Sequence, residues 1–427
     1  MVVAASAQAD VRYAEPGGTG DETMCLQIDP CDIQDAVEHP SVSDGDEIVV
    51  LPGIYALGAD PIFVEHAIDL HGAAGAPRPT IMTTGLGSIT VDDSFPGGAH
   101  VRDLKIQNHV DGGGGAGIGI NNASIGERLV VESTTLSFGT ACALGDGAML
   151  RDSTCSAPGD NGTGVSVFPA PVMVEQASLL NVTAFGGSAG VLARGTDGAT
   201  ATLNAKNVIA EGTDADAAAF TLAPGDTATI VLEYSNYDTK QEFDGGDASV
   251  TDPGTPTNQT AAPLLVDPAG GDFHQLLGSP TINAGATDPD LGVLDIDGDP
   301  RMQGGAPDIG ADEFVPANSF SFGKLKRNKK KGIAFLFVIL PGPGEVALAG
   351  KGVKSIPLAS AAAQTSRPVA GGRVKLKVAP AKKGKRARKI RRALKINGKA
   401  KIKVLVTYVP TGGTAKTVAR KLKLIKR

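Results

Sequence analysis

The sequence has no tryptophan, few aromatic side chains and no long apolar run. Its 427 residues include 13 Phe and 5 Tyr, and aromatic residues make up 4% of the chain. The longest apolar run, Ile333 to Leu340, has eight residues, whereas a membrane-spanning helix needs about 20. The sequence therefore excludes a transmembrane segment and a core built on large aromatic rings.

Acidic residues are nearly missing from the last quarter of the chain, and basic residues are scarce before it. Residues 1–315 contain 10 Lys or Arg and 45 Asp or Glu, whereas residues 316–427 contain 30 Lys or Arg and the single acid Glu345. The net charge of −6 is thus the sum of −35 and +29. A chain of this length is normally divided into two or three domains. We predict two oppositely charged domains, 10–315 and 320–427, joined by a linker at 316–319.

Cysteine is rare, and its placement is informative. The four cysteines form two local pairs, Cys25 with Cys31 and Cys142 with Cys155, and none lies in a Cys-x-x-Cys arrangement. Local, even pairing indicates disulfides formed in an oxidising compartment. The alternative is buried free thiols.

The first residues also bear on export. Ala7-Gln8-Ala9 is a small-x-small arrangement that a signal peptidase recognises, although no basic segment precedes it. We interpret residues 1–9 as the remnant of a signal peptide and predict a secreted or cell-surface protein. The alternative is an ordinary N-terminal tail.

Strand-like segments recur between residues 40 and 260 with little helical periodicity. Between residues 100 and 210, a polar residue precedes a strand-like triplet five times, at spacings of 25, 24, 29 and 26 residues by subtraction; the triplet is apolar-x-apolar except after Asp152, where it is Ser-Thr-Cys. The five leading residues are Asp103, Arg128, Asp152, Asn181 and Asn207. Repeats of this length are typical of a solenoid whose coils stack because none buries its apolar face alone. Together with 56 Gly and few aromatics, the pattern predicts a right-handed parallel β-helix.

This register places the five polar residues in one column, with neighbours about 4.8 Å apart as in paired strands. We interpret the column as structural, since stacked amides and ion pairs fix the register between coils. The alternative is a polar stripe along a ligand groove. The same register makes Cys155 equivalent to Ile106 and Val131, so that Cys142–Cys155 would be a buried staple.

Several segments resemble known proteins. Residues 25–36 and 45–55 look like the cap and first coil of secreted bacterial proteins with the pectin-lyase-like β-helix. Residues 278–285, 295–301 and 307–314 resemble the closing segment of β-helix surface proteins of the choice-of-anchor Q group. The resemblance covers roughly residues 10–315 and implies a secreted β-helix. It does not imply one activity, because the fold hosts lyases, hydrolases, adhesins and tail-spike-like binders.

Signals for catalysis are weak. Glycoside hydrolysis needs carboxylates about 5–9.5 Å apart, and the coil region lacks the segments of a polygalacturonase. Lyase chemistry would need a basic residue, for which Arg102 and Arg151 are candidates at equivalent positions two coils apart. His109 beside Asp111 is a further candidate acid/base pair, although a solvated loop histidine is the simpler interpretation.

A calcium site is a second candidate. Asp295, Asp297 and Asp299 offer hard oxygen ligands within a turn, which suits Ca²⁺. The alternative is a turn in which these carboxylates bond local backbone amides and Arg301. No other cofactor is indicated.

The basic region has the alternation of strands. Period-two patterns with one apolar face and one lysine face predict a small Ig-like β-sandwich. Its elements are strands at 333–340, 373–378, 401–408 and 421–424, a short helix at 386–395 and a turn at 410–413.

Such charge density attracts polyanions. The region offers almost no aromatic pattern for stacking bases, which argues against nucleic acid. An anionic envelope polymer fits an exported chain better. The alternative is that the lysines only solubilise the strands or face the acidic β-helix.

The sequence therefore predicts an exported β-helix that binds glycan or another extended ligand along its coils. Its basic domain would contact anionic envelope polymers. The competing prediction is a polysaccharide lyase or glycoside hydrolase acting on the β-helix face.

Overall fold

The computed structural model describes residues 9–92, 97–109, 115–134, 139–252, 257–356, 372–410 and 413–427. Asp111, residues 1–8 and two residues of the predicted turn at 410–413 lie outside these ranges. Contacts divide the chain into two units, Met1–Phe314 and Val315–Arg427. Within the described ranges, no helix is long and apolar enough to cross a membrane.

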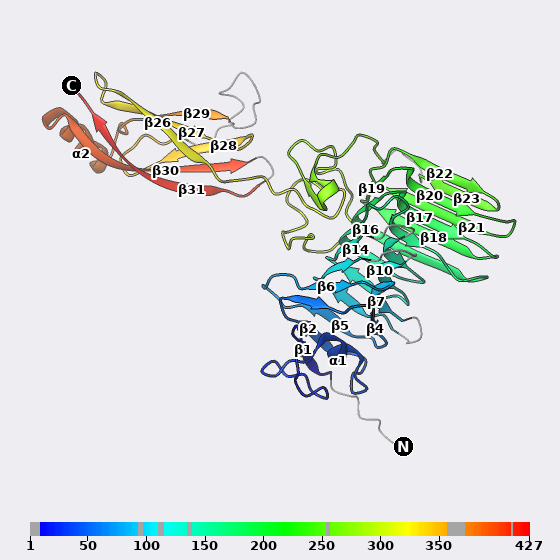
Figure 1. Cartoon of the computed structure of the whole chain (residues 1–427). Helices are drawn as coiled ribbons and strands as arrows, with labels where there is room; N and C mark the ends of the chain where they lie inside the picture. Colours follow the sequence, from blue (N-terminus) through cyan, green and yellow to red (C-terminus); the bar gives the residue numbers. More distant parts are fainter. Residues whose placement is uncertain are drawn as a thin grey trace, which may run out of the picture. The chain divides into compact units, whose positions relative to one another are not determined.

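Unit 1 is a solenoid of parallel strands arranged in three runs (Figure 1). The first run contains β1 (Val11–Ala14), β2 (Glu47–Val50), β5 (Asp69–Gly72), β8 (His100–Arg102), β11 (Ile125–Glu127), the first parts of β14 (Met149–Ala157) and β16 (Val174–Gly186), β18 (Thr200–Lys206), β21 (Thr227–Glu233) and β23 (Asp247–Thr251). The second contains β3 (Ile54–Ala56), β6 (Thr80–Thr83), β9 (Lys105–Asn108), β12 (Val130–Ser133), the later parts of β14 and β16, and β19 (Ile209–Gly212). The third contains β4 (Ile62–Val64), β7 (Gly87–Val91), β10 (Ala116–Ile120), β13 (Thr140–Leu144), β15 (Thr163–Val167), β17 (Ala189–Gly195), β20 (Ala215–Thr221) and β22 (Lys240–Asp244).

The core of the solenoid consists of small and β-branched side chains stacked coil on coil. Ile106, Val131 and Cys155 pair in register on β9, β12 and β14, and all three are fully buried. Each coil therefore buries its apolar side only against its neighbours. The predicted parallel β-helix is confirmed.

The predicted polar column lies at the sharp turn between the first and second runs. All five members adopt the left-handed conformation, with φ between 50° and 59°. Arg128 donates two hydrogen bonds of 2.7 Å to Asp103. Asn181 donates to Asp152 at 3.0 Å, and Asn207 donates to Asn181 at 2.9 Å. Because these side chains satisfy one another from coil to coil, the column holds the register of the stack.

Both predicted disulfides are present. Cys25 is bonded to Cys31 and Cys142 to Cys155. The first pair lies just before α1 (Ile33–Glu38), whose N-cap Asp32 accepts a hydrogen bond of 3.1 Å from the Gln34 amide. The second crosses the solenoid interior from β13 to β14.

A closing segment, residues 265–314, packs against the turn column. It contains the antiparallel pair β24 (Leu265–Asp267) and β25 (Asp272–Gln275), linked by η1 (Pro268–Gly270). Arg301 forms a buried ion pair of 2.6 Å with Asp152, and the backbone of Ala286 exchanges hydrogen bonds with the Asn207 side chain. The segment is thus fastened to the solenoid by the column itself.

Unit 2 consists of two antiparallel three-stranded sheets and one helix. The first sheet orders β26 (Ser321–Asn328), β27 (Ile333–Ile339) and β29 (Arg373–Val378); the second orders β28 (Gly344–Ala349), β30 (Lys399–Pro410) and β31 (Lys416–Ile425); the helix is α2 (Lys385–Ile396). Alternate residues of β27, β29 and β30 are buried. The arrangement is consistent with the predicted β-sandwich.

Candidate ligand-binding groove

A column of large side chains stands on the outer face of the third run, where the strands end. Phe243, Phe220 and Arg194 pair in register on β22, β20 and β17, and Phe168 follows β15 at the next coil. The Arg194 guanidinium lies 4.8 Å from the ring centre of Phe168 and 5.1 Å from that of Phe220. The Phe220 and Phe243 rings are 5.2 Å apart. The four side chains therefore form a continuous wall.

Small and polar side chains occupy the rest of this face. Ala189, Ala215 and Ala218 form a buried apolar cluster against Leu192. Three members of the wall, Arg194, Phe220 and Phe243, line a groove of about 430 Å³ together with this floor. Its remaining lining residues are polar: Asn161, Thr163, Ser188, Asp214 and Gln241. An apolar floor with a few directed polar groups is the usual character of a small-molecule or sugar subsite.

Arg194 has no counter-charge. Among the described residues, no carboxylate lies within ion-pair distance of its guanidinium. Its Nε is buried and has no hydrogen-bond partner within the same part of the chain. Because Arg194 lines the groove and has no ion-pair partner in this part of the chain, its guanidinium is placed to meet an acceptor on a ligand.

The predicted basic candidates lie elsewhere. Arg102 and Arg151 occupy one column on the first run, at equivalent positions two coils apart, with Glu127 between them. Arg102 pairs with Asp69 at 2.7 Å, and Arg151 pairs with Glu127 at 2.8 Å. Both guanidinium groups are thus held in a ladder of ion pairs.

The structure does not bring His109 to that ladder. His109 lies at the end of β9, where its Nδ1 is 2.7 Å from the Thr134 hydroxyl. Its suggested partner Asp111 is outside the described residues. The pairing of these two residues stays a prediction.

Glu127 is the electrostatic centre of the ladder. Burial acts to raise its pKa, but hydrogen bonds from His100 and Arg151 and the charge of Arg128 lower it to about 2. The sequence analysis did not identify Glu127, although it stands 25 residues after Arg102 by subtraction, which is the coil period.

This shift predicts a loss of stability in acid. A carboxyl whose pKa is depressed by folding stabilises the fold above its unfolded pKa, and the contribution is lost as the pH falls through the folded value. We therefore expect the contribution of Glu127 to the free energy of unfolding to be lost as the pH falls from about 4.5 to about 2. Urea midpoints measured across this window should fall more steeply for the wild type than for Glu127→Gln. Equal slopes would contradict the assignment.

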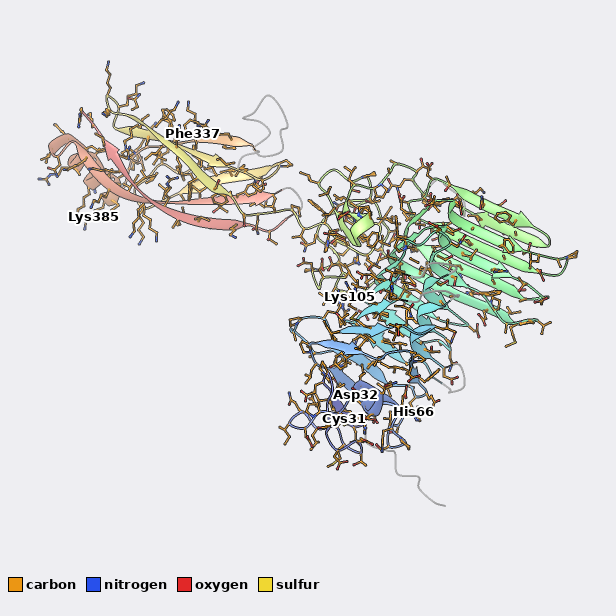
Figure 2. All side chains as sticks on the ribbon, in the orientation of Figure 1. Cys31, Asp32, His66, Lys105, Phe337 and Lys385 are labelled. Carbon is orange, nitrogen blue, oxygen red and sulfur yellow. A yellow bond between two sulfur atoms is a disulfide. The ribbon has the colours of Figure 1, made fainter. Side chains whose placement is uncertain are left out.

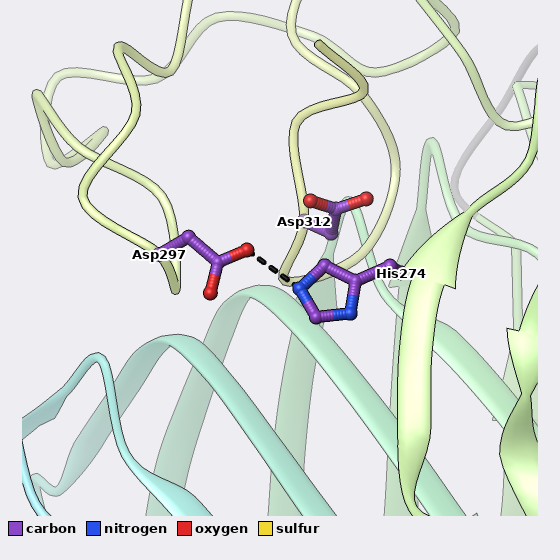
Figure 3. A group of neighbouring side chains, drawn as sticks. All are labelled: His274, Asp297 and Asp312. Atoms are coloured by element: carbon purple, nitrogen blue, oxygen red, sulfur yellow. Dashed lines mark hydrogen bonds and ion pairs between the residues drawn. The ribbon is translucent and has the colours of Figure 1, made fainter. Parts of the chain in front are cut away.

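The acidic turn in the closing segment binds its own backbone. Asp295 is fully buried, and its two oxygens accept hydrogen bonds from the amides of Asp297, Asp299 and Glu313. Asp297 instead pairs with His274 Nε2 at 2.6 Å (Figure 3). Two of the three carboxylates predicted as calcium ligands, Asp295 and Asp297, therefore have different partners.

A different set in the closing segment has metal-ligand geometry. His274, Asp297 and Asp312 place one ligand atom each within 4.8 Å of the others. Hydrogen bonds to Asp297 and Asp272 raise the pKa of His274 to about 10. His274 is thus already engaged by Asp272 and Asp297. Sequence spacing did not indicate this set, because His274 lies on β25 whereas Asp297 and Asp312 lie in later segments without regular secondary structure.

Comparison with known proteins adds little. No family model and no curated protein matches the chain. Among solved structures, the chain is similar to the enzymatically active domain of tailspike protein 2 of bacteriophage CBA120, at 11% identity and a TM-score of 0.24. The match covers 97% of this chain and 70% of that one. The β-helix assignment rests on the parallel pairing described above.

Proposed function

We propose that this protein binds an extended glycan across the outer face of the third run. The observation that carries the proposal is the groove, in which an apolar floor lies between an aromatic wall and polar side chains. Sugar rings present C–H groups on their faces and hydroxyls at their edges, which matches such a surface. Arg194 lines this groove and has no ion-pair partner among the described residues, which favours a glycan with acidic groups.

The site supports binding more than hydrolysis. Asp214 is the single carboxylate among the described residues that line the groove, and it accepts a hydrogen bond of 2.9 Å from Ser188. Hydrolysis by the usual route needs two facing carboxyl groups. A polysaccharide-degrading enzyme is the second candidate function, and cleavage of the polymer would distinguish it from a binding protein.

We further propose export and an envelope location, as for the choice-of-anchor Q proteins that the closing segment resembles. Two disulfides support this location, because they persist mainly in oxidising compartments. The basic unit would contact anionic envelope polymers there.

The glycan proposal is tested by titrating the full chain with polygalacturonate and with a neutral glucan. We expect binding of the acidic polymer, weakened about tenfold or more in Arg194→Gln because a hydrogen bond to a charged group is lost. Lys105→Gln is the matched control, since Lys105 pairs with Glu132 on the second run. It should bind as the wild type does.

Two results would count against this reading. If Arg194→Gln binds the acidic polymer as tightly as the wild type does, the groove is not the glycan-binding site. Cleavage of the polymer, abolished in Asp214→Asn, would instead establish the enzyme.

A further inference from the structure

The second sheet of unit 2 carries lysines that face one another. Lys401 on β30 is directly opposite Lys423 on β31, and Lys403 is opposite Lys421. Like charges at directly paired positions destabilise a sheet. Among the described residues of unit 2, no carboxylate forms an ion pair with any of them. The sheet therefore bears a repulsion that its own sequence leaves unrelieved.

In the first sheet, two cationic side chains lie against aromatic rings. Arg373 lies 4.2 Å from the Phe337 ring centre, and Lys375 lies 4.4 Å from that of Phe335. Figure 2 labels Phe337 in this sheet and shows the nitrogen-tipped side chains that surround the unit. Cation–π contacts thus partner the cations there. A need for solubility alone does not explain the difference, since charges of mixed sign serve that purpose.

The facing lysines line a groove beside α2. Ala387, Ile390 and Leu394 are the buried positions of this helix, and its other side chains are mostly basic. The groove has a volume of about 870 Å³. Its cationic lining residues are Arg327, Lys351, Arg386, Lys401, Lys403, Lys421 and Lys423. No acidic and no aromatic side chain is among the described residues that line it.

We infer that this groove binds a linear phosphodiester polymer that carries no bases. The inference deepens, and rests on, the proposed contact of the basic unit with an anionic polymer. Lys401 and Lys403 are two residues apart on one strand, so their spacing is about 6.7 Å. A phosphodiester repeat with six bonds between phosphorus atoms spans about 7 Å when extended, as two peptide residues do. Successive phosphates therefore match successive lysines.

The side-chain types favour phosphate and disfavour bases. Five of the seven cations are lysines, which bind phosphate as point charges, whereas planar carboxylates are better matched by the fork of arginine. Single-stranded nucleic acids are bound through aromatic side chains on which bases stack, and the described lining has none. An occupying polyanion would relieve the repulsion between the facing lysines.

The experiment titrates the full chain with poly(glycerol phosphate) at several salt concentrations and compares two double variants. Lys401→Glu with Lys403→Glu places acids opposite Lys423 and Lys421. We expect about 100-fold weaker binding, because phosphate contacts dominate such affinities, together with a higher melting temperature. The control variant, Lys329→Glu with Lys330→Glu, makes the same change in net charge outside the groove. We expect it to lose less than threefold in affinity for poly(glycerol phosphate).

Each other outcome has a distinct meaning. If both double variants lose the same binding affinity, the groove is not the binding site, and only a general contact between the basic unit and polyanions remains. If oligothymidylate or polygalacturonate binds more tightly than poly(glycerol phosphate), and Lys401→Glu with Lys403→Glu removes that tighter binding, the polymer class is wrong. Binding of none of these polymers would overturn the proposed contact itself.

Discussion

Replacement of Arg301 by methionine is expected to lower the free energy of unfolding of the β-helix by about 3–5 kcal/mol. Arg301 is 1% exposed and pairs at 2.6 Å with Asp152, which is fully buried. The guanidinium also donates to the carbonyl oxygens of Gly310 and Ala311. Burial raises the pKa of Asp152, and the charge of Arg301 opposes that rise. Without Arg301, an uncompensated carboxyl remains in the core. Urea unfolding followed by circular dichroism measures the loss.

Two further variants test whether the loss comes from the buried charge of Asp152 rather than from any disruption of the contact between the solenoid and the closing segment. Lys206→Met removes the ion pair between Lys206 and Asp288, which also joins the solenoid to the closing segment but is partly exposed. It should cost about 1 kcal/mol or less. Adding Asp152→Asn to Arg301→Met should recover stability, because both charges are then gone. A double variant less stable than Arg301→Met would contradict the buried-charge explanation.

Replacement of Cys142 and Cys155 by alanine is expected to cost about 3 kcal/mol. Their bond closes a loop with a sequence separation of 13 and lies in the solenoid core. The loss comes mainly from greater freedom of the unfolded chain. Thermal and urea unfolding of the double variant provide the measurement.

The Cys25–Cys31 bond is the internal comparison. Its sequence separation is 6, so the same loop-entropy relation gives a smaller loss of about 2 kcal/mol for its removal. If removal of the terminal disulfide destabilises the β-helix more than removal of the central one, the loop-entropy account fails.

The sequence predicted the turn column because its signal is local and periodic. Asp and Asn tolerate the left-handed conformation, and they occupy four of the five positions of the column. The position of Arg128 followed from spacing alone, and its bonds to Asp103 confirm it. The disulfides followed from local pairing in the same way.

The groove escaped the sequence analysis although it obeys the same period. Phe168, Arg194, Phe220 and Phe243 are 26, 26 and 23 residues apart by subtraction. The column mixes phenylalanine with arginine, so no single residue type recurs at the coil period. Only the strand register, on β17, β20 and β22 and just after β15, shows that these side chains are neighbours. The same holds for the facing lysines of β30 and β31, since a sequence reveals alternation but not which strands pair.

Residue order alone thus determined the β-helix, its coil period, both disulfides and the division into an acidic and a basic part. These features depend on contacts between neighbouring coils or between residues close in the chain, which a repeating pattern encodes directly. Tertiary structure alone decided that Arg194 has no ion-pair partner among the described residues, that Asp152 meets Arg301, and that Asp295 and Asp297 have different partners. Such outcomes depend on where loops of unequal length place distant side chains, and no local pattern specifies that placement.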